Sequence, residues 1–384
     1  MPLMFPSVGE LNQLMRTWAK VWADAYRWPD YFGELWNALD VYQSPQVYSW
    51  FPPVNYERVL ASMLALSHWV TPPPAGDPLR MIFGDKLRLS PFPEPIAHGP
   101  AITLREQIGY LLRRLARHMR DDTRRLDDHS FAFLQYRTLF ERLREEFEIG
   151  VFSLNYDGAA VRAMPEAFNG FDACGRFDPA AVHQRESLDF LYQIHGSVHY
   201  SLRSPSSTEI CWRSDLDGEF IDDDGAIGPR LASEWKLLPV ATIVAGGFKL
   251  DQLLAEPFHS FQAALIRHLY DADAILIAGY GFTDVHVNRA LKHRLNGAER
   301  PPVMIVDKRT PGALSIANEP WAAALCDSLL TDGWSFKGDR GGHWEVNTVH
   351  RIALCNDGML GAAQSPEVIE RLLENVDTAV DSAG

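Results

Sequence analysis

The segment that decides the fold reads Ile275-Leu276-Ile277-Ala278-Gly279-Tyr280-Gly281-Phe282-Thr283-Asp284. Its first four residues are apolar without interruption, which predicts a short buried strand, and the glycines that follow mark the turn where the strand ends. Apolar residues recur at helical spacing on either side, in Phe258 to Asp271 before the strand and in Asp284 to Leu295 after it. A helix, a strand and a helix in this order are typical of a parallel sheet covered by helices.

Three more apolar runs predict strands of the same kind: Ile149 to Leu154, Phe190 to Ile194 and Val303 to Val306. Because helical patterns separate several of these runs, the sequence predicts an α/β fold, a Rossmann-like doubly wound parallel sheet with a helical insertion. The expected regions are a helical front section and insertion over 1–148, the Rossmann-like core over 149–330, and a C-terminal extension over 331–384 with a short helix from Pro366 to Val380.

The composition is that of a folded protein, and its charge argues against nucleic acid as the default partner. Of 384 residues, 46% are hydrophobic and 22% are charged, as in ordinary globular domains. The 36 basic and 50 acidic residues give a net charge of −14, which argues against direct nucleic-acid binding. The four cysteines include no Cys-x-x-Cys pair, and no stretch has the pattern of a signal peptide or a membrane span. We therefore expect a cytoplasmic protein without membrane contact.

The front section is rich in tryptophan and arginine. Its tryptophans have helix-like spacing; they could line an aromatic ligand site, but core positions are their expected role. Thr103 and Glu106 have the spacing of a capping box, which predicts that a long amphipathic helix begins there, and a second helix is expected from Ser130 to Glu146. The arginines from Arg113 to Arg125 form a stripe that could meet an acidic partner, but the aspartates among them favour a solvated, salt-bridged face.

Three predicted strand ends carry polar residues suited to chemistry. They read Ser153-Leu154-Asn155-Tyr156-Asp157, His195-Gly196-Ser197 and Gly279 to Asp284. Ligands of such sheets bind beyond the carboxyl ends of the strands, so we expect these segments to lie close together. Taken singly, each also fits an ordinary turn or a buried histidine.

In this order the three segments resemble the sirtuin superfamily, specifically the zinc-free sirtuin-like domains of prokaryotic anti-phage defence proteins. The resemblance covers most of Pro2 to Asp307 and includes Gly247-Phe248-Lys249 with Glu256-Pro257. It implies that residues 149–330 bind NAD and that Asn155 and His195 are catalytic. The cofactor-binding residues that it implies are Ser153, Asp157, Gly196, Gly279, Gly281, Asp284 and Asp307.

The activity implied by the resemblance is hydrolysis of NAD to nicotinamide and ADP-ribose, with NAD as the substrate and no metal. The residue types suit this reaction. An Asn carboxamide can orient a water, and a His with a pKa near neutral can take a proton from that water or from a ribose hydroxyl. The resemblance also implies a biological role, depletion of NAD in a phage-infected bacterium as abortive infection, and activation by assembly. The expected partners are further copies of the chain and a defence protein such as a nucleotide-driven ATPase.

The first departure from the family pattern concerns zinc. Protein-deacylating sirtuins hold a zinc through two Cys-x-x-Cys pairs after the His-Gly motif, whereas this chain has only Cys211 there, so protein deacylation is the weakest alternative. The corresponding stretch, Ser201 to Pro229, is rich in aspartate but lacks EF-hand spacing, which predicts a solvated hairpin rather than a calcium loop. His195 and His199 are four apart, but their strand context disfavours a metal pair.

The second departure concerns the phosphate-binding loop. The family opens with a strand and a Gly-Ala-Gly-x-Ser turn that cradles the pyrophosphate, and Pro2 to Pro6 resembles the segment just after that turn. Either the sequence starts late or the cradle is lost. We expect weak or no hydrolysis by the 384 residues, and recovery when about twenty residues carrying such a turn are restored. The alternative function is a catalytically impaired nucleotide-binding or assembly module.

Overall fold

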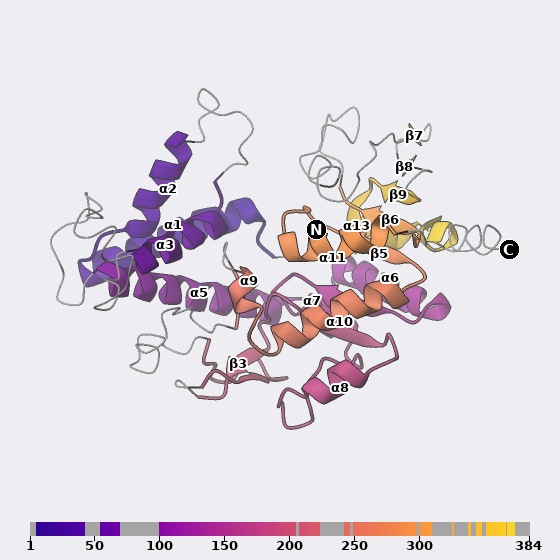
Figure 1. The fold of residues 1–384 in the computed structure, drawn as a ribbon, viewed down its shortest axis with the longest axis horizontal. Helices are drawn as coiled ribbons and strands as arrows, with labels where there is room; N and C mark the ends of the chain where they lie inside the picture. The colour runs from indigo at the N-terminus through magenta and orange to yellow at the C-terminus, as the bar shows by residue number, and fades with distance from the viewer. Residues whose placement is uncertain are drawn as a thin grey trace.

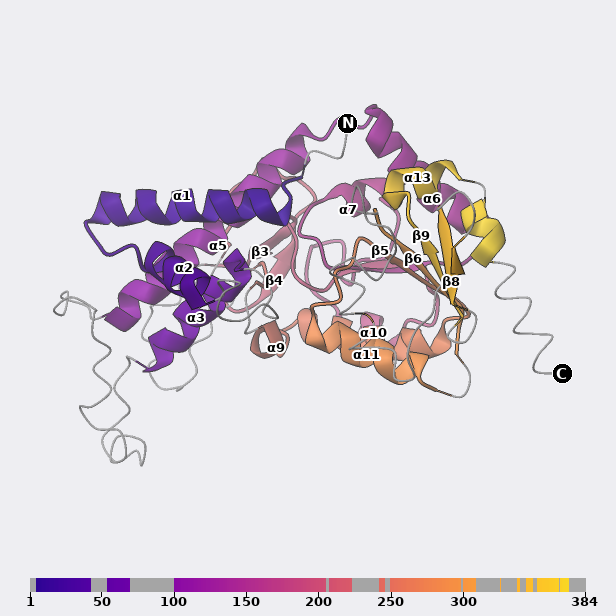
Figure 2. The same cartoon turned by 90° about the horizontal axis from the view of Figure 1, so that it is seen from above.

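A helical front section and an α/β core make up the molecule, side by side (Figures 1 and 2). Among the described residues, none of the helices has the length and apolar character needed to cross a bilayer. The computed structural model describes residues 5–42, 54–69, 100–204, 207–222, 242–245, 249–297, 300–308, 325, 337–338, 343–347, 351–365 and 367–372.

In its described residues, the front section packs four helices around one apolar cluster. Trp18 and Trp36 are buried in this cluster, so the core role predicted for the tryptophans is confirmed for these two. Tyr156 and Val198 of the core belong to the same cluster, which ties the two parts of the molecule together. The four helices are α1 (Val8–Tyr26), α2 (Tyr31–Tyr42), α3 (Tyr56–Trp69) and α5 (Pro100–Arg125).

Helix α5 begins earlier than the capping-box pattern predicts. Its first residue is Pro100, so Thr103 lies within the first turn and is not the N-cap. Proline is favoured in the first turn of a helix because its fixed φ suits the helix and its missing N–H leaves no intrahelical bond unmade. The capping-box prediction is therefore wrong. The second helix, expected from Ser130 to Glu146, is confirmed as α6 (Phe131–Glu146), and Ser130 is its N-cap, because the Ser130 hydroxyl accepts from the Phe133 N–H at 3.3 Å.

A five-stranded sheet forms the centre of the α/β core. Its first three strands in spatial order are parallel to one another, and each of the last two pairs antiparallel with the strand before it. Two of the predicted strands, Ile275 to Ala278 and Val303 to Val306, have the predicted limits. The spatial order is β5 (Ile275–Ala278), β6 (Val303–Val306), β9 (Ile352–Cys355), β8 (Trp344–Asn347) and β7 (Lys337–Gly338).

Helices cover both faces of this sheet because side chains alternate along each strand. Val303 and Ile305 of β6 pack with α10 (Phe258–Asp271) and α11 (Val285–Leu295). The residues between and after them, Met304 and Val306, pack on the other face against α6 and α13 (Gly358–Gln364). The sheet lies between these two layers of helices in Figure 2.

The other described strands form two small sheets. The first pairs β1 (Gly150–Ser153) in parallel with β2 (Phe190–Gln193), and the second pairs β3 (Tyr200–Leu202) with β4 (Ile210–Trp212) as an antiparallel hairpin. The predicted α/β class and parallel strands are confirmed, whereas the described strands form three sheets and not one. Strands β2 and β5 contact each other through side chains of one hydrophobic cluster, and they are not paired by backbone hydrogen bonds. The remaining short helices are α7 (Ala159–Ala163), α8 (Pro179–Gln184) and α9 (Lys249–Gln252).

The sheet also draws on the region that the sequence assigns to a C-terminal extension. Strands β7, β8 and β9 all follow residue 330, and β9 pairs in parallel with β6. That region therefore contributes strands to the sheet of the core. The helix expected from Pro366 to Val380 is seen over residues 367–372, and the rest of it lies outside the described residues.

The arginine stripe of α5 is not wholly solvated. Arg120 is 3% exposed, and its Nη2 donates to the Asp222 Oδ1 at 2.6 Å while its Nε donates to the Val198 carbonyl at 3.2 Å. The prediction of a solvated face is therefore wrong at Arg120, although Arg117 is exposed as expected. In the stretch predicted as a solvated hairpin, Ser201 to Pro229, strands β3 and β4 form a hairpin, and Asp215 and Asp217 after it are exposed. Asp222 is buried and pairs with the Arg120 guanidinium, and residues 223–229 lie outside the described residues.

Candidate functional site

The parallel register brings the predicted strand ends to common edges. Ser153 pairs with Gln193 at the end of β1 and β2, and the Ile194 N–H donates to the Ser153 carbonyl at 3.0 Å, so Asn155 and His195 leave the same edge. In the larger sheet the Gly279 N–H donates to the Val306 carbonyl at 3.0 Å, which places the glycine turn beside Asp307. This is the edge at which ligands of parallel sheets bind.

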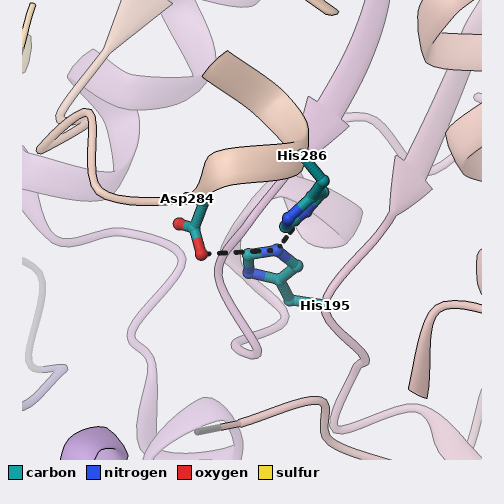
Figure 3. A group of neighbouring side chains, drawn as sticks. All are labelled: His195, Asp284 and His286. Atoms are coloured by element: carbon teal, nitrogen blue, oxygen red, sulfur yellow. Dashed lines mark hydrogen bonds and ion pairs between the residues drawn. The ribbon is translucent and has the colours of Figure 1, made fainter. Parts of the chain in front are cut away.

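His195 faces two residues from the start of α11 (Figure 3). Its Nε2 lies 2.9 Å from the Nε2 of His286 and 4.0 Å from the Oδ1 of Asp284. At 2.9 Å one imidazole nitrogen carries a proton and donates it to the lone pair of the other. The strand end of β2 and the N-terminus of α11 thus meet through three polar side chains, although His195 and His286 are 91 residues apart in the chain.

Burial sets the charge of this cluster. The His195 side chain is 2% exposed, and burial, together with the Lys249 ammonium, lowers its pKa to about 3. Burial also lowers the pKa of His286, so both rings are neutral near pH 7. The pKa near neutral that the sequence suggests for His195 is wrong, because the sequence does not reveal how completely the ring leaves water.

Lys249 balances the carboxylates around the histidines. Its Nζ lies 2.7 Å from the Asp284 Oδ1 and 3.1 Å from the Glu57 Oε1, so it joins α9, α11 and α3. Burial alone would raise the pKa of Asp284, but the charge and the hydrogen bond of Lys249, together with the neighbouring histidines, hold that pKa below the ordinary value. Asp284 is therefore ionised beside two neutral imidazoles.

The Asn155 segment presents one predicted residue outward and buries another. Asn155 is exposed, and its N–H donates to the Ser153 hydroxyl at 3.2 Å. Asp157 is 8% exposed; its Oδ1 accepts from the Ala159 N–H at 2.9 Å at the start of α7, and burial raises its pKa. The side chain of Asn155 is thus open to a ligand, whereas that of Asp157 shapes the turn.

Gly196 follows His195 in a conformation that a side chain would disturb. Its φ is +100°, and a Cβ there would collide with the Thr242 carbonyl oxygen. The Val244 N–H donates to the His195 carbonyl at 2.8 Å, so residues 242–245 hold the His-Gly strand end in place. Gly196 therefore serves the close approach of two backbone segments.

The glycine turn after β5 is open on the side where a ligand would lie. A Cβ at Gly279 or Gly281 would meet no atom within 4 Å, and Gly279 has a φ of +61°. Tyr280 and Asn288 brace the turn from within, because the tyrosine hydroxyl donates to the Asn288 Oδ1 at 2.8 Å and the Asn288 amide donates to the Phe282 carbonyl at 2.7 Å. The two glycines predicted to bind the cofactor thus line open space on a turn that these hydrogen bonds hold in place.

Asp307 ends β6 at the same edge as this turn. Its N–H donates to the Cys355 carbonyl at 3.0 Å, and its Oδ1 accepts from the Lys308 N–H at 2.7 Å. The structure therefore groups the predicted residues in two places. His195 and Asp284 face each other directly, and Gly279 and Asp307 share the sheet edge.

Sequence reasoning missed His286 and Glu57, and it noted Lys249 only as part of a resembling block. His286 lies in an ordinary amphipathic helix pattern, two residues after Asp284, and Glu57 lies on a front helix. The one available signal was a pair of ionisable residues, Asp284 and His286, at the start of the helix that follows the glycine turn. Their convergence on His195 depends on tertiary packing.

Comparison with known proteins finds a match to a family model. No curated protein matches the chain. The stretch with a family match begins at β1, extends beyond Asp307, and makes up somewhat less than half of the chain. SIR2-like domains bind NAD, and members of the family are NAD-dependent enzymes. Residues 150–325 match the family model described as SIR2-like domain, which supports a sirtuin-like domain over the strands and helices that carry the site.

Proposed function

We propose that this chain hydrolyses NAD to nicotinamide and ADP-ribose at the cluster around His195. The observation that carries the proposal is the meeting of a neutral, buried His195 with the ionised Asp284 at the edge where Asn155 also leaves its strand. The SIR2-like match over residues 150–325 supports NAD as the ligand of this edge.

The reaction breaks the bond between the ribose C1′ and the nicotinamide nitrogen and forms a bond from C1′ to a water oxygen. The nicotinamide keeps the electron pair of the broken bond and leaves as a neutral molecule, while the water releases one proton. Asn155 has the exposed carboxamide needed to orient that water, and the lone pair of the neutral His195 can receive the proton. Asp284 lies close enough to stabilise the imidazolium that forms.

The adenosine half of NAD fits the other end of the edge. Gly279 and Gly281 present open backbone, and Asp307 at the end of β6 offers a carboxylate of the kind that binds ribose hydroxyls. We propose that these residues, with Ser153, Asp157 and Gly196 shaping the nicotinamide side, form the NAD site.

The proposed cellular role follows from the resemblance of the site segments to defence proteins. Hydrolysis would deplete NAD in a phage-infected bacterium, with the chain acting as a cytoplasmic homo-oligomer that a partner such as a nucleotide-driven ATPase activates. The acidic net charge of −14 supports a role without direct nucleic-acid binding.

A second candidate function is a nucleotide-binding or assembly module without turnover. It is favoured by the low pKa of His195, about 3, because a ring that holds a proton so weakly is a poor general base. Both functions predict that the chain binds NAD, but only the first predicts that nicotinamide is released.

Calorimetric titration with NAD and ADP-ribose, run beside a chromatographic assay of nicotinamide release, tests the proposal. NAD hydrolysis predicts binding of both ligands together with release of nicotinamide that falls about 100-fold or more in Asn155→Ala. Binding of both ligands without release would favour the module. Binding of neither would exclude both functions for this edge.

A further inference from the structure

The side chains that face one another in Figure 3 also form a set of metal ligands. One ligand atom each from His195, His286 and Asp284 lies within 4.8 Å of the other two. Two imidazoles and one carboxylate are a common donor set of protein zinc sites that keep a fourth position open. Zinc-class ions, Zn²⁺ and Co²⁺, prefer such nitrogen-rich sites, whereas Mg²⁺ and Ca²⁺ prefer oxygen ligands.

The distances between the donor atoms are close to those of a tetrahedral site. Bonds of about 2.0–2.1 Å to the ion place the ligand atoms about 3.3 Å apart. The two Nε2 atoms are 2.9 Å apart, and the His195 Nε2 lies 4.0 Å from the Asp284 Oδ1. The donor atoms of the third pair, His286 and Asp284, lie within 4.8 Å of each other. Shifts of about 1 Å in the side-chain atoms would therefore bring the three donors to the spacing of a tetrahedral site.

The carboxylate is directed toward the histidines and not toward its own helix. Asp284 is the N-cap residue of α11, yet its side chain makes no capping hydrogen bond to the helix amides. Lys249 shares the Asp284 Oδ1 but has a second carboxylate partner, Glu57, at 3.1 Å. Lys249 can therefore pair with Glu57 when an ion takes the Asp284 oxygen.

The charges around the cluster favour a cation. The ionisable groups that surround the two imidazoles are the carboxylates of Asp284 and Glu57 and the single ammonium of Lys249, so the acidic groups outnumber the basic one. For an ion to bind both Nε2 atoms, each ring must carry its proton on Nδ1. This requires a change of tautomer in one ring and no loss of charge.

We propose that His195, His286 and Asp284 form a binding site for a zinc-class divalent ion, and that the bound ion blocks NAD hydrolysis by occupying the His195 Nε2. The first part stands on the three side chains alone. The second part rests on the proposed function, because it requires His195 to act in turnover.

The test titrates the full chain, freed of metal by chelation, with Co²⁺, whose visible absorption bands report tetrahedral nitrogen and oxygen ligands. Zn²⁺ is then added to displace the Co²⁺. The variant His286→Asn removes one ligand and keeps a polar group, and Asp284→Asn removes the charged ligand. The matched control is His293→Asn, which removes an exposed imidazole from the same helix. Circular dichroism checks that each variant is folded.

The site predicts one equivalent of Co²⁺ with tetrahedral bands, affinity lowered at least tenfold in His286→Asn and in Asp284→Asn, and no change in His293→Asn. The absence of these bands, or equal affinity in a folded His286→Asn, would overturn the site.

Inhibition is measured separately as nicotinamide release with Zn²⁺ and after its removal by chelation. Zn²⁺ that binds at the cluster without slowing release would overturn the inhibitory role, and absence of release without any metal would count against the proposed function while the Co²⁺ result stands.

Discussion

Burial lowers the pKa of two histidines in this chain, and the contacts of each ring then determine what it can do. His195 and His199 are 2% and 5% exposed, and burial lowers the pKa of each well below the ordinary value. They differ in their partners. His195 faces the polar side chains of α11, whereas the His199 Nδ1–H donates to the Arg213 carbonyl at 2.8 Å and its Nε2 has no hydrogen-bond partner among the described residues. The first histidine therefore lies among the polar groups of the proposed site, whereas the second is held by the backbone of the hairpin.

His199 gives the fold a dependence on acid pH. Burial lowers its pKa to about 4 in the folded state from 6.5 when unfolded, so the unfolded chain binds more protons as pH falls between these values. Stability is therefore complete above pH 6.5 and is lost as pH falls toward 4. From pH 7 to pH 5 the loss assigned to His199 is about 2 kcal/mol. Urea unfolding of His199→Asn, which keeps a donor for Arg213 but cannot protonate, should show a pH dependence weaker by this amount. An equal pH dependence in both proteins would refute the assignment.

Gly196 and Gly281 should respond differently to alanine. Gly196→Ala adds a Cβ that collides with the Thr242 carbonyl oxygen in a conformation with φ of +100°, so we expect a loss of stability of about 2 kcal/mol or more. Gly281→Ala meets no atom within 4 Å and should change stability by no more than about 0.5 kcal/mol. Thermal unfolding of both variants measures this contrast. Equal melting temperatures would contradict the packing described for Gly196.

At the scale of elements, strands and amphipathic helices could be predicted from local pattern. The limits of β5, β6 and α10 agree with the sequence because each is an unbroken apolar run or a clear helical period. Strands β7, β8 and β9 were missed, since they are short and their place beside β6 depends on pairing between distant segments. For the same reason the sequence located His195 and Asp284 but not His286, the second residue that contacts the His195 ring.

The Arg120–Asp222 pair joins α5 to the segment after β4 and should be costly to break. Both side chains are at most 4% exposed, so removal of either partner leaves a buried charge without its counterion. We expect Arg120→Met to lower the free energy of unfolding by about 3–5 kcal/mol. The matched control, Arg117→Met, removes an exposed arginine of the same helix and should change it by no more than about 0.5 kcal/mol. Denaturant unfolding that gives similar values for both would show that burial is not decisive here.

At the scale of the whole molecule, the front section contributes to the site of the core. Glu57 of α3 and Asp284 of α11 both contact the Lys249 ammonium, and Tyr156 after β1 donates from its hydroxyl to the Val244 carbonyl at 3.1 Å beside them. The front helices therefore do more than cover the core. They supply one of the two carboxylates that hold the lysine next to His195.

Lys249 should contribute more than Glu57 to the stability of the contact between the front section and the core. Lys249→Met leaves Asp284 and Glu57 close together without a cation, and we expect a loss of about 2 kcal/mol in the free energy of unfolding. Glu57→Gln leaves the shorter contact between Lys249 and Asp284 intact, so the loss should stay below about 1 kcal/mol. Urea unfolding of the two single variants and the double variant measures the coupling. A Glu57→Gln loss as large as that of Lys249→Met would contradict this order.

The measurement that most directly tests the central claim is nicotinamide release from NAD by the chain and by its His195→Ala variant, followed by chromatography under identical conditions. Because His195 is the proton acceptor of the proposed site, release should fall about 100-fold or more in the variant while its circular dichroism spectrum stays unchanged. Equal release by a folded His195→Ala protein, or no release by a chain that binds NAD even after the glycine-rich turn is restored, would contradict the claim.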